Sequence, residues 1–71
     1  MLKRERFVNK LRELGYKFKK ETPATHLYRC GTHPVFVPKT DLLTETYVRI
    51  TLQTCNCGTD EIEAFVRAAK V

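Results

Sequence analysis

The stretch THLYRCGTHPVFVP, residues 25–38, constrains the fold more than any other part of the chain. It contains two runs with β-branched and aromatic residues, 25–30 and 34–38, separated by Gly31-Thr32. Glycine tolerates the positive φ that a tight hairpin turn requires. Pro38 ends the second run because proline lacks the N–H that a strand ladder needs. We therefore predict a β-hairpin over these residues.

Side chains along the first strand of this hairpin are expected to alternate between its two faces. One face carries Thr25, Leu27 and Arg29, and the other carries His26, Tyr28 and Cys30. His26 is polar and titratable, and it stands at the head of the hairpin next to basic residues. It is the residue that suggests chemistry.

The segment before the hairpin predicts a helix and a further strand. Apolar residues recur at helical spacing through Lys3–Leu14, and Gly15 suits a left-handed C-cap. Residues 16–21 alternate apolar and charged through Phe18, which is typical of a half-buried strand. We expect Tyr16 and Phe18 on the core side of that strand.

The segment after the hairpin predicts two more helices. Leu42 and Leu43 are expected to cover the end of the sheet, and Thr44 is a suitable N-cap for a helix that reaches Cys55. Thr59 is expected to cap a short third helix. The residues of this third helix expected to face inward are Ile62, Phe65, Val66 and Ala69.

This order of elements predicts an α+β fold, with a three-stranded antiparallel sheet packed on two helices and its other face open. The 71 residues are expected to form one domain, residues 1–71. No apolar run approaches the roughly 20 residues of a membrane helix. The charged start, Lys3-Arg4-Glu5-Arg6, does not resemble a secretory signal peptide. We expect a cytoplasmic protein with no membrane partner.

The three cysteines, Cys30, Cys55 and Cys57, are an odd number in a chain without an export signal, so we interpret them as reduced thiols. Cys55-Asn56-Cys57 lacks the two-residue spacing of a zinc knuckle. Four ligands would require His26, His33 or Cys30 from a distant strand. We expect no metal and no other cofactor.

The net charge of +5 is concentrated in the first half of the chain. Residues 1–33 carry nine basic and three acidic residues (+6), and residues 34–71 carry four and five (−1). The basic half is the expected side for a polyanion. A solvated helix face with a solubilising strand explains the same charges. The basic residues in and beside the predicted hairpin are Lys17, Lys19, Lys20 and Arg29.

Several segments are similar to one known family. Leu11–Tyr16 is similar to the segment in which that family's first helix ends and its first strand begins. Thr25–Arg29 is similar to the family's second strand, in which a histidine precedes a tyrosine. Val35–Pro38 is similar to its third strand. The helix from Thr44 and the acidic segment after Gly58 match as well. Over nearly its whole length the chain resembles the HicA-type toxins, partners of HicB antitoxins with a fold like the double-stranded-RNA-binding domain.

The resemblance implies a type II toxin that cleaves mRNA, with His26 as the catalytic residue and a HicB-like antitoxin as the partner that covers the site. Metal-free RNA cleavage needs a base and an acid, and imidazole suits both roles. The basic residues Lys17, Lys19, Lys20 and Arg29 would hold phosphates, and Tyr28 would stack on a base.

The residues alone also allow structural roles. His26 would then bond to a backbone group, Tyr28 would belong to the core or to a cross-strand pair, and His33 would be an exposed loop residue. Cys30 as a nucleophile would need a nearby base that the sequence does not place. The alternative function is a non-catalytic module of the same fold that binds RNA or a protein and does not need His26.

Overall fold

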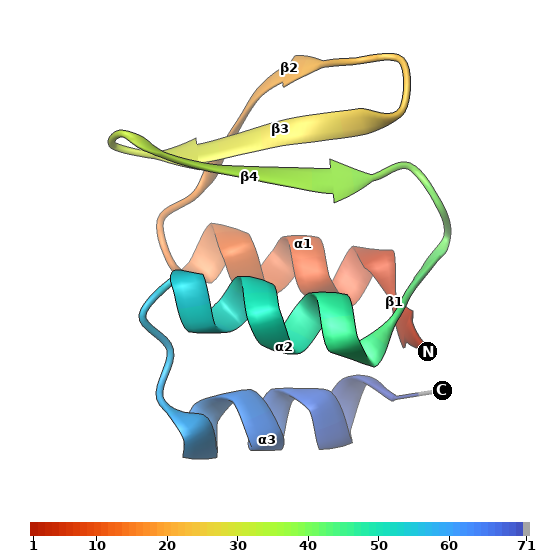
Figure 1. The fold of residues 1–71 in the computed structure, drawn as a ribbon, viewed down its shortest axis with the longest axis vertical. Helices are drawn as coiled ribbons and strands as arrows, with labels where there is room; N and C mark the ends of the chain where they lie inside the picture. Colours follow the sequence, from red (N-terminus) through yellow and green to blue (C-terminus); the bar gives the residue numbers. More distant parts are fainter. Residues whose placement is uncertain (71) are drawn as a thin grey trace.

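The computed structural model describes residues 1–70 and arranges them in layers (Figure 1). The elements are β1 (Leu2–Lys3), α1 (Arg4–Glu13), β2 (Lys17–Glu21), β3 (Thr25–Cys30), β4 (His33–Pro38), β5 (Leu42–Leu43), α2 (Glu45–Thr54) and α3 (Thr59–Ala69). The sheet of β2, β3 and β4 forms one layer, α1 and α2 form the next, and α3 lies beyond them. The predicted α+β fold with a three-stranded antiparallel sheet is confirmed.

The strands β3 and β4 form the predicted hairpin, with β3 in the centre of the sheet. Their register runs from Cys30 opposite His33 to Thr25 opposite Pro38. Gly31 has a φ of 62°, which suits the first central position of a two-residue type II′ turn. On the other side of β3, β2 pairs antiparallel with a bulge between Phe18 and Lys20.

The two faces of the sheet have different environments. Tyr28, Val35 and Val37 are buried against the helices, as members of the core cluster. The alternate residues Leu27 and Phe36 are directly opposite each other and lie on the outer face. His26 pairs with Val37 and therefore shares the helix-facing side. The predicted alternation is confirmed, and the structure adds which side meets the helices.

One hydrophobic core joins the layers. Its members include Phe7, Val8 and Leu11 of α1, Val48 and Leu52 of α2, and Ile62, Val66 and Ala69 of α3. Full burial of a large apolar side chain contributes about 1.5–3 kcal/mol. This packing matters most for α2, because threonine has weak helix propensity and several threonines fall in or beside that helix.

The helix ends confirm two predictions and correct a third. The Thr44 side chain accepts a hydrogen bond of 3.1 Å from the Tyr47 N–H, and Gly15 after α1 has a φ of 96°. Thr59 does not cap α3: Gly58 occupies the N-cap position, without a side-chain bond, and Thr59 is the first helical residue. The third helix is also not short, because it spans 11 residues.

Within residues 1–70, no helix has both the length and the apolar character needed to cross a bilayer.

A second, two-stranded sheet joins β1 to β5 and was not predicted. Leu2 pairs with Leu43 and Lys3 with Leu42. Leu43 therefore enters the core as a strand residue, while Leu42 stays 40% exposed. A two-residue strand is too short to show an alternating pattern in the sequence. The pairing forms because the start of α1 and the end of β4 lie close together.

Candidate functional site

His26 lies at the inner wall of a cleft between α1 and the sheet. The cleft has a volume of about 540 Å³ and also contacts Tyr28 and Val8. Its charged lining comprises Lys3, Arg4, Glu5, Arg12 and Asp41, so cations outnumber carboxylates. The His26 side chain is 28% exposed. Solvent therefore reaches the imidazole, while the surrounding elements restrict its orientation.

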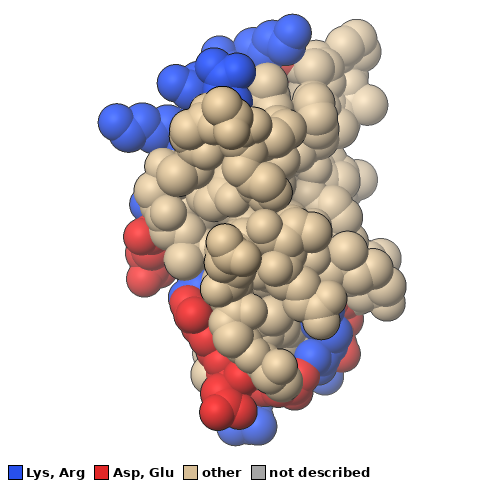
Figure 2. Space-filling model, turned by 60° about the vertical axis from the view of Figure 1, so that its left-hand side comes forward, with Lys and Arg blue, Asp and Glu red and all other residues tan. Residues whose placement is uncertain are grey.

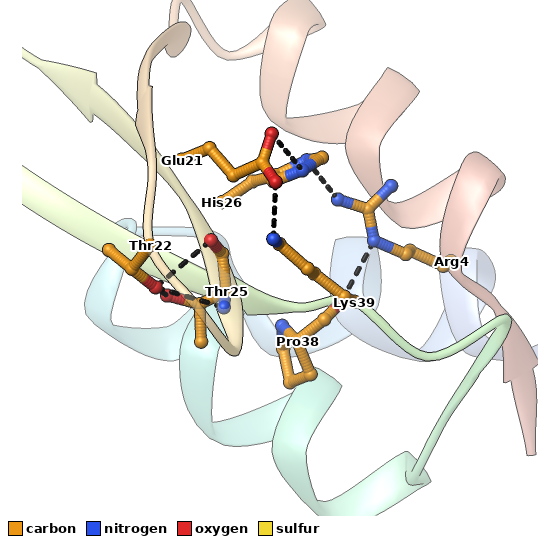
Figure 3. A network of polar contacts seen from close by, with 7 residues as sticks. All are labelled: Arg4, Glu21, Thr22, Thr25, His26, Pro38 and Lys39. Carbon is orange, nitrogen blue, oxygen red and sulfur yellow. Dashed lines mark hydrogen bonds and ion pairs between the residues drawn. The ribbon is translucent and has the colours of Figure 1, made fainter.

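Arg4 is the nearest cation to His26 (Figure 3). Its Nη2 lies 2.7 Å from His26 Nδ1. A guanidinium has donors but no acceptor, so Nδ1 must accept this hydrogen bond. A neutral imidazole that accepts at Nδ1 carries its proton on Nε2. The contact with Arg4 thus assigns the tautomer of His26.

Glu21 faces the other nitrogen of the same ring. It is the cross-strand partner of His26 in the pairing of β2 with β3, and its Oε1 lies 3.8 Å from His26 Nε2. Its Oε2 accepts a hydrogen bond from Lys39 Nζ. This bond, with a smaller contribution from His26, lowers the pKa of Glu21. Like any glutamate, this carboxylate is ionised at neutral pH, so it presents negative charge to the Nε2 proton.

Backbone contacts hold Arg4 at the cleft. Its Nε donates a hydrogen bond of 2.8 Å to the carbonyl oxygen of Pro38, and its own N–H donates to the carbonyl oxygen of Asp41 at 2.9 Å. Arg4 is also the first residue of α1. The end of β4 and the start of α1 thus position the guanidinium beside His26.

The turn before His26 is closed by two threonines (Figure 3). The hydroxyls of Thr22 and Thr25 lie 2.6 Å apart, and the Thr25 N–H donates to Thr22 Oγ1 at 2.9 Å. The Thr22 N–H donates to the Thr25 carbonyl oxygen at 2.8 Å. These bonds satisfy the polar groups of the turn and fix the head of β3 from which His26 projects.

Phe18, rather than Tyr28, is the exposed aromatic residue beside His26. Its ring makes edge-to-face contacts with His26 and Tyr28, with centroid distances of 5.4 and 5.7 Å. Phe18 lies on the core side of β2, as predicted, because it pairs with the buried Tyr28. The ring is nevertheless 49% exposed, because β2 is an edge strand. Tyr28 is 3% exposed and belongs to the core, which leaves its ring little surface on which a base could stack.

The basic residues singled out from the sequence do not surround His26. Lys17 pairs with Arg29, and Lys20 pairs with Leu27, so these three cations share the outer face of the sheet. Lys19 falls in the bulge of β2. Figure 2 shows lysine and arginine side chains gathered at the top of the molecule, the end that β2 occupies in Figure 1. Strand alternation therefore separates these residues from the imidazole.

Sequence reasoning missed Arg4, Arg12 and Glu21 as neighbours of the histidine or its cleft. The helix pattern of α1 predicted which residues are polar, but not which of them would face the strand. The excess of basic residues in the first half of the chain was the available signal. For Glu21, the signal was its position close to the β2–β3 turn, where a short connection brings it opposite His26.

A second polar contact lies at the opposite end of the hairpin. His33 is not an exposed loop residue as predicted: it begins β4, and its Nδ1 lies 2.6 Å from the Tyr16 hydroxyl. Burial raises the pKa of Tyr16 and also that of Cys57. Among residues 1–70, no group of three or more His, Cys, Asp or Glu side chains is arranged to hold a metal ion.

Comparison of the chain with protein-family models, with curated proteins and with solved structures found no match. The site combines an imidazole of assigned tautomer with a guanidinium at Nδ1 and a carboxylate on the Nε2 side. Such a set can bind an anion and move a proton.

Proposed function

We propose that this chain is a HicA-like toxin of a type II toxin–antitoxin system, with a fold like the double-stranded-RNA-binding domain, that cleaves mRNA without a metal ion. The observation that carries the proposal is His26 in a solvent-accessible cleft, with Arg4 in contact with its ring. Metal-free RNA cleavage needs an imidazole close to a group that binds phosphate. The sequence resemblance supports the same conclusion.

The proposed reaction is an internal transfer of the phosphoryl group. His26 accepts the proton of the 2′-hydroxyl, the O2′–P bond forms, and the P–O5′ bond breaks. The leaving 5′ oxygen takes a proton from solvent, which leaves a 2′,3′-cyclic phosphate and a 5′-hydroxyl. Arg4 offsets the negative charge that develops on the phosphoryl oxygens.

The cations on the outer face extend the RNA-binding surface in this proposal. β2 is an edge strand, so a single-stranded RNA leaving the cleft past Phe18 can cross that edge. Lys19 belongs to the bulge of this edge strand, and Lys17, Lys20 and Arg29 lie on the outer face that the RNA would then follow. Backbone phosphates of the flanking nucleotides would bind these cations. Tyr28 has no place among the proposed RNA contacts.

The proposed protein partner is a HicB-like antitoxin that covers the cleft. A partner seated over α1 and the end of β3 would exclude RNA from His26. Because the cleft lining carries more cations than carboxylates, an acidic segment of the partner is the best match in charge.

Two purified variants test the activity. Wild type, His26→Ala and the control His33→Ala are incubated with a synthetic single-stranded RNA in EDTA, and each is also expressed from an inducible promoter. We expect the wild type and His33→Ala to cleave RNA and arrest growth, and His26→Ala to bind RNA without cleaving it. Circular dichroism checks that each variant folds. The proposal fails if wild type leaves RNA intact, or if His26→Ala cleaves at the wild-type rate.

The alternative is a non-catalytic module of the same fold that binds RNA or a protein. One observation favours it: in the free protein Arg4 occupies the Nδ1 lone pair and Nε2 carries the proton, so neither nitrogen is ready to act as a base. This alternative predicts RNA binding, or binding of an acidic protein, that His26→Ala does not change. Affinity for RNA would fall steeply as salt rises.

A further inference from the structure

We infer that Arg4 caps the base nitrogen of His26 in the free protein and leaves it for the RNA phosphate, and that Glu21 holds the ring in the required tautomer throughout. This inference rests on the proposed nuclease function and deepens it. It assigns Arg4 to contact with the reacting phosphate and Glu21 to positioning His26. It also identifies Nδ1 as the nitrogen that takes the proton.

The identity of the reacting nitrogen follows from the hydrogen bonds. Arg4 Nη2 can only donate, so the lone pair of His26 points at it from Nδ1. The Nε2 side faces Glu21 Oε1 at 3.8 Å, where an N–H is attracted and a lone pair would be repelled. For Nε2 to accept the proton, the ring would need the other tautomer, with an N–H facing Arg4 and a lone pair facing Glu21. Acceptance at Nδ1 requires only that Arg4 moves.

An RNA phosphate supplies the reason for Arg4 to move. A phosphate carries a full negative charge and can accept two parallel hydrogen bonds from a guanidinium, whereas the neutral Nδ1 offers one lone pair and no charge. The bond from Arg4 Nε to the Pro38 carbonyl keeps the side chain at the cleft while the planar guanidinium turns as a unit and moves Nη2 away from His26. Substrate binding then frees Nδ1 and neutralises the phosphate in one step.

Glu21 acts through His26 rather than on the RNA. When Nδ1 takes the 2′-hydroxyl proton, the ring becomes an imidazolium whose Nε2–H faces the Glu21 carboxylate. This carboxylate is ionised at neutral pH, and the hydrogen bond from Lys39 lowers its pKa further. The carboxylate therefore stabilises the charged ring that forms during the reaction.

Nitrogen NMR of the full chain tests the capping directly. Histidine-labelled protein at pH 8 is recorded alone and with an all-2′-deoxy oligonucleotide, which binds but cannot be cleaved. We expect His26 in the Nε2–H tautomer, with an Nδ1 resonance that shifts when the oligonucleotide binds. Arg4→Met should shift Nδ1 in the free protein and remove most of the further change. Arg6→Met, on the same helix but lining a different cavity, should do neither.

Steady-state kinetics separate the two roles. Arg4→Met should lower kcat by about 10²–10³-fold, the usual loss for a donor to a developing charge. Glu21→Gln should lower kcat with little change in KM. Its effect should be roughly tenfold, far below the loss of about 10⁴ at a buried triad carboxylate, because the Glu21 side chain is 61% exposed. Glu13→Gln is the matched control and should match wild type.

The outcomes distinguish this inference from the nuclease proposal. An Nδ1–H tautomer in the free protein, or an Nδ1 resonance unchanged by Arg4→Met, overturns the capping. So does RNA cleavage by Arg4→Met at the wild-type rate. If wild type never cleaves RNA but the oligonucleotide still shifts the Nδ1 resonance in an Arg4-dependent way, the nuclease proposal is wrong. The inference that Arg4 caps Nδ1 and leaves it when an anion binds would then still hold.

Discussion

Tyr47 of α2 donates a hydrogen bond from its hydroxyl to the main-chain oxygen of Phe36 in the edge strand β4. That oxygen points away from β3. The Lys39 N–H bonds to the Ala24 oxygen across the hairpin, and alternate residues turn their main-chain groups outward. Counting back from Lys39, the outward residues of β4 are Pro38, Phe36 and Pro34. Tyr47 thus occupies an acceptor that another strand would otherwise use.

The two prolines complete the protection of this edge. Pro34 and Pro38 have no N–H at outward positions, and the Pro38 oxygen accepts from Arg4. We predict that the double variant Pro34→Val, Pro38→Val self-associates through β4, because it gains two outward donors. Size-exclusion chromatography over a range of concentrations measures this. Pro23→Val, in the exposed β2–β3 turn, is the control and should elute like wild type. Equal elution of the double variant would refute the prediction.

The outer face of the sheet should set the salt dependence of nucleic-acid binding. Each phosphate contact with a single strand contributes about 0.7 to the slope of log affinity against log salt. Lys17→Gln with Lys20→Gln should reduce that slope by about 1.4. Fluorescence anisotropy with a labelled 2′-deoxy oligonucleotide provides the measurement. Arg67→Gln on α3 is the control, and a slope equal to wild type in the lysine variant would exclude these residues from the interface.

Shortening a side chain of α2 should lower the free energy of unfolding on the buried side of the helix and leave it nearly unchanged on the exposed side. Leu52 is fully buried, so Leu52→Ala should lower the free energy of unfolding by about 2–5 kcal/mol. Ile50 on the same helix is 56% exposed, and Ile50→Ala should change it by less than about 0.5 kcal/mol. Urea unfolding followed by circular dichroism compares the two. Similar losses in both variants would contradict the packing described above.

Stability should fall in alkaline solution because of Tyr16. Burial raises the pKa of its phenol in the folded protein, whereas the unfolded chain titrates near pH ~10. Below that pH both states bind the proton. Above it the unfolded state alone releases the proton, so the free energy of unfolding should drop by up to about 1.4 kcal/mol per pH unit from this residue. Tyr16→Phe should show a shallower decline in urea titrations from pH 9 to 11, although Tyr47, whose pKa burial also raises, still contributes. An unchanged decline would show that Tyr16 is not responsible.

Local patterns predicted the elements well, and failed where an element met its neighbours. Apolar periodicity located α1 and α2, and Gly31 located the hairpin turn, because these signals depend on residues close in the chain. The exposure of Phe18 and the pairing of Leu43 with Leu2 depend on which strand lies at an edge and where the chain returns. No local period contains that information.

The sequence by itself determined the secondary structure of the hairpin and helices, the separation of β3 into two faces, and His26 as the residue of interest. Only the tertiary structure decided which face of β3 meets α1. For that reason Arg4 and Glu21 lie beside the imidazole. The cations expected from the sequence, Lys17, Lys20 and Arg29, lie on the opposite face. The physical reason is that alternation along a strand sets two sides without naming them. The side that carries Tyr28, Val35 and Val37 is the one buried against the helices. His26 lies on the same side of the sheet, so it also faces the helices.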